Sequence, residues 1–320
     1  MHVYRWDLDR TYLDTDIHSM RGLLRAAVET AAEKQNIPGS AALLRALVRH
    51  DPDARVVVLS GSPTQLRDVL MEKLALDGVR VDRLVLKDSL SSLKRGRLRA
   101  VTGQVGYKLP QLLKLREGLG PGVHETLFGD DSEVDALVYS VYADAIAGRL
   151  KGRELSRIME AGGAYSDAVR DALASLDRVG HSDAVRDIFI RCDHRVRVAQ
   201  FALLGPRVIP VFSWFQAALV LWHRKRLDAT DVFNVARAIA EQARVPDVAL
   251  AGLLQDIVRR HHLPPEAARA WLDDAIGLGP LASQLHRALD LLGDPPQAPN
   301  WPSTPQYLAF LKAVEGQEPA

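Results

Sequence analysis

The feature that most constrains the fold of this 320-residue chain is an alternation of strand and helix patterns in its first half. Residues 55–60 form a valine-rich apolar run, which is typical of a strand buried on both faces. Further strand patterns end just before Asp7 and lie at residues 79–86 and 124–128, and helical patterns separate them. The alternation predicts right-handed βαβ units, and hence an α/β fold with a parallel sheet flanked by helices.

The pattern changes after residue 150. Residues 151–185 have a helical pattern that we interpret as an insertion, and residues 185–192 and 207–213 are predicted strands that complete the sheet. From residue 228 onward every predicted element is a helix. We therefore expect a first domain at residues 1–226 and an all-α C-terminal region at residues 227–320. Helices are expected at residues 20–34, 40–50, 63–76, 108–117, 134–150, 228–244, 246–262, 264–276, 280–292 and 305–314.

The C-terminal helices are amphipathic and need a partner surface, because short isolated helices are marginal in water. Apolar residues recur at helical spacing, as in Val232, Val235, Ala236 and Ile239. Docking onto the first domain, homo-oligomerisation and a separate protein partner all satisfy that need. No residue in this region has the spacing of a catalytic or metal motif, so we expect it to shape access or association.

Two carboxylates follow the first strand pattern, which begins at Val3. Asp7 and Asp9 are two residues apart, and residues i and i+2 of an extended strand point the same way. The sequence thus predicts two carboxylates aimed at one spot, with the hydroxyl of Thr11 next. Hard oxygen groups at this edge of a sheet suit Mg²⁺. The alternative interpretation is a solvated turn, since turns favour aspartate.

Further polar groups follow in chain order and, with the lysine as the exception, each comes at the end of a predicted strand. They are Asp7-x-Asp9-x-Thr11, Ser60-Gly61-Ser62, Lys108, and Gly129-Asp130-Asp131 with Asp135. Phosphoryl transfer needs such parts: a carboxylate nucleophile, a second carboxylate as acid and base, a divalent cation, and donors for the equatorial oxygens. One pocket for phosphoryl transfer is predicted.

This order of motifs resembles the haloacid dehalogenase-like superfamily, over residues 2–150. The segments 59–63, 85–88 and 129–139 are similar to the catalytic domain of the actin-patch-associated phosphatidate phosphatases and their bacterial relatives. The resemblance implies a Rossmannoid parallel sheet and a Mg²⁺-dependent phosphatase that works through an aspartyl-phosphate.

The resemblance also implies a role for each site residue. Asp7 is implied as the nucleophile, Asp9 as the acid and base, and Lys108 as the group that stabilises charge. The phosphoryl group is implied to bind Thr11, Ser60 and the Gly61 N–H. The Mg²⁺ ligands implied are Asp7, Asp130 and the Asp9 carbonyl, with support from Asp131 or Asp135.

The chain departs from the family pattern at several positions near these motifs. Relatives commonly have aspartate at Arg10, histidine at Tyr107, proline at Ala136, and Ser-Gly where this chain has Asp131-Ser132. The metal and nucleophile roles therefore carry over, while the identity of the substrate does not. The substrate is expected to be a phosphorylated small molecule or a lipid headgroup. The alternative is a catalytically weak protein that binds a phospho-ligand or a partner on the same scaffold.

Composition narrows the partners and the compartment. Lysine and arginine number 41 and aspartate and glutamate 40, so a nucleic-acid binder, which is usually strongly basic, is not expected. The single cysteine, Cys192, excludes an internal disulfide framework. No signal peptide is evident, and the longest apolar run, residues 208–222, is shorter than the roughly 20 residues of a membrane span. We expect a cytoplasmic protein without a transmembrane segment. Peripheral membrane contact stays open, and the basic stretch 94–99 is either a solvated loop or an attractor of anions.

Overall fold

The structure is a computed structural model, and it describes residues 1–15, 29–88, 103–132, 134–193, 196–274, 280–293 and 297–315. Contacts divide the chain into two compact units. The first unit comprises Met1–Gln35, Ala54–Pro210 and Trp301–Ala320, and the second comprises Asn36–Asp53 and Val211–Asn300. Each unit is described by itself below.

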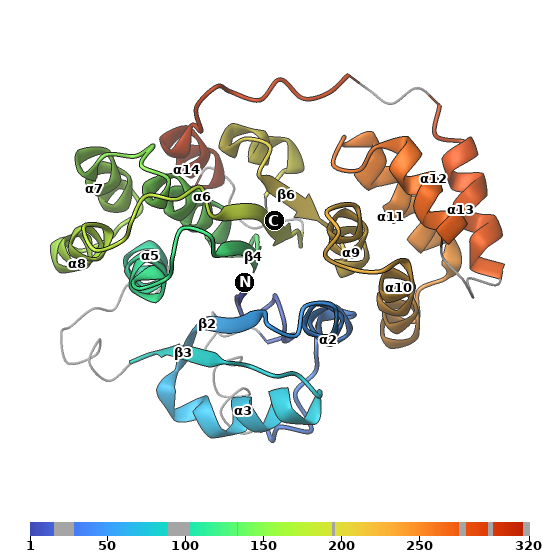
Figure 1. Cartoon of the computed structure of the whole chain (residues 1–320), viewed down its shortest axis with the longest axis horizontal. Helices are drawn as coiled ribbons and strands as arrows, with labels where there is room; N and C mark the ends of the chain where they lie inside the picture. The colour runs from blue at the N-terminus through green and yellow to red at the C-terminus, as the bar shows by residue number, and fades with distance from the viewer. Residues whose placement is uncertain are drawn as a thin grey trace. The chain divides into compact units, whose positions relative to one another are not determined.

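The first unit is built on a six-stranded sheet with the order β3-β2-β1-β4-β5-β6 (Figure 1). Its strands are β1 (His2–Trp6), β2 (Arg55–Pro63), β3 (Arg83–Lys87), β4 (His124–Asp130), β5 (Val185–Arg191) and β6 (Val208–Val211). The pairs β1/β2, β1/β4, β2/β3 and β4/β5 are all parallel. The predicted α/β fold with a parallel sheet is confirmed, and both late strands join the sheet.

A row of aromatic side chains fixes the register of the central strands. Trp6 pairs with Phe128 and Phe128 with Phe189 across three neighbouring strands. The rings of Trp6 and Phe128 stack with centroids 4.2 Å apart, and those of Phe128 and Phe189 stack at 5.4 Å. The residues after Trp6 and Phe128 are Asp7 and Gly129, so the polar site begins directly after this aromatic row.

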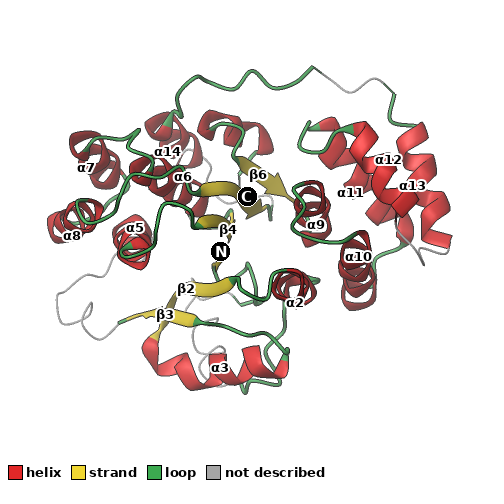
Figure 2. Cartoon of the chain, in the orientation of Figure 1, coloured by secondary structure: helices red, strands yellow, loops and turns green. Residues whose placement is uncertain are grey.

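Helices and 3-10 turns of the first unit flank its sheet (Figure 2). They are η1 (Thr64–Leu66), α3 (Arg67–Leu76), α5 (Gly103–Arg116), α6 (Asp135–Ile146), α7 (Gly152–Ala161), α8 (Ser166–Leu176), η2 (Val198–Leu204) and α14 (Tyr307–Glu315). Helix α6 is buried along its whole length, since α5, α14, η2 and the strands β4 and β5 all pack on it. Helices α5 and α6 therefore hold fixed places beside the strands that end at the site.

The second unit is helical in its described part. Its helices are α2 (Ser40–His50), α9 (Trp214–His223), α10 (Ala229–Ala243), α11 (Asp247–Arg259), α12 (Pro265–Asp274) and α13 (Pro280–Asp290). The apolar face of α10 is buried, as its periodicity predicts, and α10 packs on α2 and α9. An N-terminal capping box of Asp228 and Asp231 satisfies backbone donors at the start of α10.

The compact units differ from the predicted boundary at residues 226/227. Helix α2 groups with the C-terminal helices, and α14 groups with the sheet, because the Tyr307 hydroxyl donates to Asp144 on α6 and α14 packs on α6, α7 and η2. The division into separately folding domains stays a prediction.

Two predicted segments fall wholly or mostly outside the described residues. The helix predicted at residues 20–34 falls mostly on residues 16–28, and the basic stretch 94–99 falls on residues 89–102; both ranges lie outside the described residues. The described end of the first segment, residues 31–33, is a turn, so the helix does not extend that far. None of the helices in the described part of the chain is both long and apolar enough to cross a bilayer.

Candidate functional site

The site begins where β1 and β4 end beside each other. The Asp7 N–H donates to the Phe128 carbonyl at 2.9 Å, which continues the pairing of the two strands past Trp6. Asp130 is the last residue of β4, and Asp135 is the first residue of α6. Carboxylate oxygens of Asp7, Asp130 and Asp135 lie within 4.8 Å of one another, and all three residues are buried. The predicted convergence of Asp7 and Asp130 is confirmed.

Lys108 completes this group from the second turn of α5. Its Nζ lies 2.8 Å from Asp7 Oδ1 and 2.5 Å from Asp135 Oδ1, and the side chain is fully buried. The helix begins at Gly103, five residues before the predicted start at Lys108, so the lysine is held by helix on both sides. Lys108 pairs with two of the three buried carboxylates, and like charges gathered away from water repel strongly. The donor set therefore suits a divalent cation with oxygen ligands, such as Mg²⁺.

Gly129 allows Asp135 to come this close. A Cβ at Gly129 would lie 2.5 Å from Asp135 Oδ2, 2.7 Å from Asp135 Cβ and 2.8 Å from Tyr139 Cε2. Real Cβ atoms do not approach other atoms at such distances, so α6 or its first side chain would have to move. The glycine before Asp130 is thus a requirement of packing at the site.

We expect Gly129→Ala to weaken Mg²⁺ binding and to lower the free energy of unfolding by about 1–3 kcal/mol, the usual cost of overpacking. Isothermal titration with Mg²⁺ and chemical denaturation measure the two effects. Gly120→Ala is the matched control, since a Cβ there meets nothing within 4 Å. Equal Mg²⁺ affinity in the two variants would show that the close approach at Gly129 has no bearing on the carboxylate group.

Asp9 lies in a different set of contacts from Asp7. Its Oδ2 accepts from the hydroxyls of Ser60 and Ser62, each at 2.8 Å, and its Oδ1 accepts from Thr15 Oγ1 at 2.5 Å. Strand β1 ends at Trp6, so Asp7 and Asp9 follow the strand and do not lie in it, and the prediction that both carboxylates are aimed at one spot stays a prediction. Arg10, with φ 59°, has the left-handed conformation within the turn that follows. Asp9 is therefore held by hydroxyl groups and Asp7 by a lysine.

The residues predicted to bind the phosphoryl group all lie at this edge of the sheet. Thr11 Oγ1 donates to Asp130 Oδ2 at 3.1 Å, while Ser60 contacts Asp9 as described above. Gly61 faces Gln104, since a Cβ there would lie 3.0 Å from Gln104 Nε2. These hydroxyls thus orient the carboxylates, and their predicted contact with a phosphoryl group stays a prediction.

Of the two residues predicted to support the metal, the structure brings Asp135 to the other carboxylates. Asp131 has other contacts: its Oδ1 accepts from the Asp193 N–H at 2.8 Å and its Oδ2 from the Val196 N–H at 3.1 Å. It fastens the segment after β5 to the end of β4. Asp130 in turn accepts from both the N–H and the hydroxyl of Ser132.

Sequence reasoning missed several residues near Asp9. The motif Ser60-Gly61-Ser62 is part of the predicted pocket, but the contacts of Ser62 and Thr15 with Asp9 are not predicted from the sequence. Lys34 is buried, its Nζ lies 3.8 Å from Glu29, and its electrostatic interactions reach Asp9. Burial lowers the pKa of Lys34, and the charges of Glu29 and Asp9 oppose that shift. No motif spacing marks Lys34, because it approaches through the fold.

The positions that depart from the family pattern also make contacts here. The Tyr107 hydroxyl donates to the Ser60 carbonyl at 3.0 Å, which joins α5 to β2. Arg10 pairs with Asp193, and Arg191 donates to the Arg10 carbonyl at 3.0 Å. Two arginines and an aspartate thus lie beside the turn that carries Asp9.

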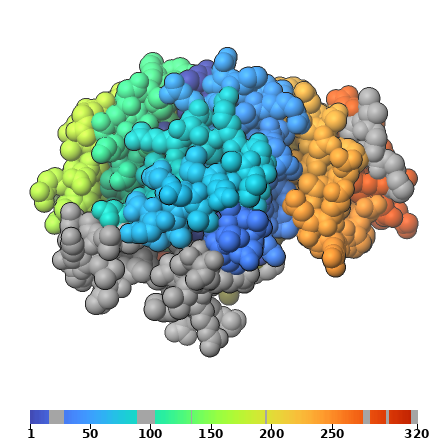
Figure 3. Space-filling view, turned by 90° about the horizontal axis from the view of Figure 1, so that it is seen from below, coloured from blue at the N-terminus to red at the C-terminus, as the bar shows by residue number. Residues whose placement is uncertain are grey.

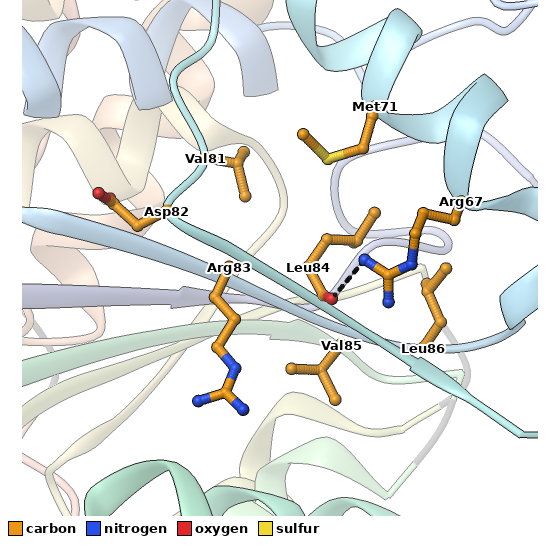
Figure 4. A pocket seen from close by; sticks show the side chains of 8 residues that line it. All are labelled: Arg67, Met71, Val81, Asp82, Arg83, Leu84, Val85 and Leu86. Atoms are coloured by element: carbon orange, nitrogen blue, oxygen red, sulfur yellow. Dashed lines mark hydrogen bonds between the residues drawn. The ribbon is translucent and has the colours of Figure 1, made fainter. Parts of the chain in front are cut away.

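Two features away from the site hold none of the predicted site residues. A hollow of about 510 Å³ lies between α3 and β3, where Arg67 donates to the Leu84 carbonyl (Figure 4). Figure 3 shows the face of α3 and β3, coloured blue to cyan. In the second unit, potential metal-ligand atoms of His50, Asp228 and Asp231 lie within 4.8 Å of one another. The two carboxylates already form the capping box of α10, and Asp231 also pairs with Arg49.

One comparison with known proteins finds a match, and it covers the segment that contains the site. Residues 6–152 match the family model described as phosphatidate phosphatase APP1, catalytic domain. The matched segment contains Asp7, Lys108, Asp130 and Asp135, so the resemblance stated from the sequence is confirmed for this part of the chain. No curated protein and no solved structure matches the chain. The segment that carries the site is thus similar to this phosphatase catalytic domain.

Proposed function

We propose that this chain is a Mg²⁺-dependent phosphatase that hydrolyses a phosphoric monoester through an aspartyl-phosphate on Asp7. The observation that carries the proposal is a group of three buried carboxylates within 4.8 Å of one another, in a segment similar to phosphatidate phosphatases. One directly follows β1, one ends β4 and one begins α6. Lys108, which bonds to two of them, supports the same assignment.

Asp7, Asp130 and Asp135 are the side chains that would hold Mg²⁺, and by the family resemblance the Asp9 carbonyl joins them. The donors are all oxygen and are buried, which fits this ion. When bound, Mg²⁺ screens the negative charge of the phosphate and of the carboxylates from one another. Asp131, with its carboxylate on two backbone N–H groups, is better assigned to the architecture of the site.

The first half of the reaction forms a bond between an Asp7 oxygen and phosphorus and breaks the bond from phosphorus to the leaving oxygen. Asp9 gives its proton to that oxygen, so the alcohol leaves neutral. The three hydroxyls around Asp9 can accept as well as donate, so they can hold its protonated form too. Lys108 keeps Asp7 oriented and, by the family resemblance, stabilises the charge of the transferred phosphoryl group.

The second half uses Asp9 as a base. Asp9, now ionised, takes a proton from water while the water oxygen attacks phosphorus, and the bond between phosphorus and Asp7 breaks. The hydroxyls of Thr15, Ser60 and Ser62 donate to the ionised carboxylate in the arrangement of the structure. Both half-reactions thus use one carboxylate at two protonation states, and phosphate is released.

The substrate class follows from the family rather than from the site. A phosphatidate headgroup is a phosphoric monoester, so we propose phosphatidate or a related phosphomonoester as substrate. A cytoplasmic location and peripheral contact with membranes stay predictions.

Metal removal tests this function. We expect turnover of p-nitrophenyl phosphate or of dioctanoyl phosphatidate with Mg²⁺, a loss of at least about 10²-fold with excess EDTA, and recovery when Mg²⁺ is restored. Comparing the two substrates distinguishes a broad phosphomonoesterase from a lipid-directed one. If neither these nor a broad panel of phosphomonoesters is hydrolysed with Mg²⁺, the catalytically weak phospho-ligand binder becomes the better assignment.

A further inference from the structure

A second polar cluster lies in the first unit, around Glu125 near the start of β4. The carboxylate is fully buried, and each of its oxygens accepts two hydrogen bonds. Arg5 donates to both oxygens at 2.8 Å, Arg116 donates to Oε1 at 3.1 Å, and the Tyr142 hydroxyl donates to Oε2 at 2.7 Å. None of these residues belongs to the motifs of phosphoryl transfer.

The partners of Glu125 lie on the elements that carry the site. Arg5 lies on β1 two residues before Asp7, which follows the strand; Arg116 follows Lys108 on α5 by eight (116 − 108), and Tyr142 follows Asp135 on α6 by seven (142 − 135). Seven or eight residues make about two helical turns, so each pair shares one face of its helix, about 10–12 Å apart. Strand β4 supplies Glu125 to this cluster and Asp130 to the site. The segment β1–Asp7, strand β4, helix α5 and helix α6 thus each supply one residue to the Glu125 cluster and one to the candidate site.

The ionisation states of Glu125 and Tyr142 in this cluster do not change over an ordinary range of pH. Burial opposes ionisation of Glu125, but Arg5 and the hydrogen bonds outweigh it, so the pKa of Glu125 lies below its ordinary value of 4.5. Burial raises the pKa of Tyr142 well above 10.0, and the charge of Glu125 raises it further. Glu125 is therefore ionised and Tyr142 remains a hydrogen-bond donor throughout the pH range of an ordinary enzyme assay.

We propose that Glu125 is a positioning residue, which sets β1, α5 and α6 at the spacing where Asp7, Lys108 and Asp135 meet. The inference rests on the proposed function. Reacting groups must be held closely, because a displacement of about 1 Å can reduce a rate by about 10²-fold. A buried ionic cluster with several directional bonds holds its elements in one arrangement, whereas apolar contacts between them permit sliding.

The same unit contains a control cluster of matching composition. Asp144, also on α6, accepts from the Tyr307 hydroxyl, from Arg149 Nε at 2.8 Å and from Arg207 Nη1 at 3.1 Å. Its central carboxylate, like that of Glu125, accepts from one tyrosine and two arginines, and the exposed Asp183 also accepts from both of these arginines. Its partners lie on α14 and on loops before β6 and after α6, and none of these carries a proposed site residue. The two clusters therefore differ in what they connect.

Tyr142→Phe and Tyr307→Phe form the experiment, since each removes one hydroxyl from one cluster. With the monoester that the wild-type protein hydrolyses, we expect Tyr142→Phe to lower kcat by about tenfold while KM changes by about twofold or less. Tyr307→Phe should leave kcat within about twofold of the wild-type value. We expect the Tm of Tyr307→Phe to fall by about as much as the Tm of Tyr142→Phe, because each variant loses one buried hydrogen bond. Mg²⁺ affinity, measured by isothermal titration, should weaken in Tyr142→Phe alone.

Equal kcat values and equal Mg²⁺ affinities in the two variants would overturn the proposal, because the Glu125 cluster would then act through stability alone. Glu125→Gln perturbs the cluster more strongly than Tyr142→Phe. If Glu125→Gln does not fold, the comparison of Tyr142→Phe with Tyr307→Phe tests the proposal. A wild-type protein that binds Mg²⁺ but hydrolyses no monoester contradicts the proposed function, and the difference in Mg²⁺ affinity then decides the positioning role. A wild-type protein that neither binds Mg²⁺ nor hydrolyses any monoester overturns both.

Discussion

Replacement of Asp7 by asparagine is expected to reduce phosphatase turnover by about 10⁴-fold or more, the scale seen when a covalent nucleophile is removed. An amide has the shape of the carboxylate but does not attack phosphorus. The fold should be kept, because Lys108 retains Asp135 as an ion-pair partner and one of three gathered negative charges is removed. Initial rates and circular dichroism measure the two effects.

Asp131→Asn is the matched control for Asp7→Asn. It makes the same change at the same edge of the sheet, but Asp131 bonds to the backbone N–H groups of Asp193 and Val196. An asparagine oxygen can still accept one of these bonds, so a loss of about tenfold or less is expected. Wild-type turnover in Asp7→Asn, or an equal loss in both variants, would rule out a special role of Asp7.

Asp9→Asn is expected to lower steady-state turnover by about 10²–10⁴-fold, the contribution of a general acid and base. An amide neither protonates the leaving oxygen nor takes a proton from water. With p-nitrophenyl phosphate, whose leaving group needs little protonation, we expect an initial burst of p-nitrophenol followed by slow turnover. Stopped-flow absorbance measures the burst.

Ser62→Ala is the companion variant to Asp9→Asn. It removes one of the three hydroxyl donors to Asp9 and keeps the carboxylate. A loss of about tenfold is expected, as for one hydrogen bond to a charged group. Unchanged steady-state turnover in Asp9→Asn would assign the acid and base role to another group, of which buried Lys34 is the first to examine.

Much of the fold was predictable because its signals are local. The valine-rich run at 55–60 became β2, and the apolar runs at 185–192 and 207–213 became β5 and β6. Helical periodicity located α10 to α13 within a few residues. These patterns depend on period and burial, which a single sequence displays.

The grouping of the elements was not predictable in the same way. Helix α14 belongs with the sheet because Tyr307 reaches Asp144, 163 residues earlier in the chain. Nothing in the periodicity of residues 307–315 distinguishes a helix that returns to the sheet from one that stays with its neighbours. A truncation at the predicted boundary near Arg226 would therefore also remove α14 from the first unit and uncover α6.

The site shows the same division between local and long-range information. Motif order predicted that Asp7, Lys108 and Asp130 converge, because parallel strands end at one edge. It left Asp131 and Asp135 as alternatives, and the choice depended on the close approach that Gly129 permits. It also missed the Ser62 and Thr15 contacts to Asp9, since these depend on how the chain turns after β1.

The most direct test of the account is chemical trapping of the phospho-enzyme. Asp9→Asn is mixed with substrate and Mg²⁺, quenched in acid, and reduced with borohydride, which converts an aspartyl-phosphate to homoserine. Peptide mass spectrometry then locates the product. An aspartyl-phosphate on Asp7 predicts homoserine at position 7, dependent on substrate and not found in an Asp7→Asn/Asp9→Asn double variant. Unmodified Asp7 after a measured burst of product, or homoserine at another aspartate, would contradict it.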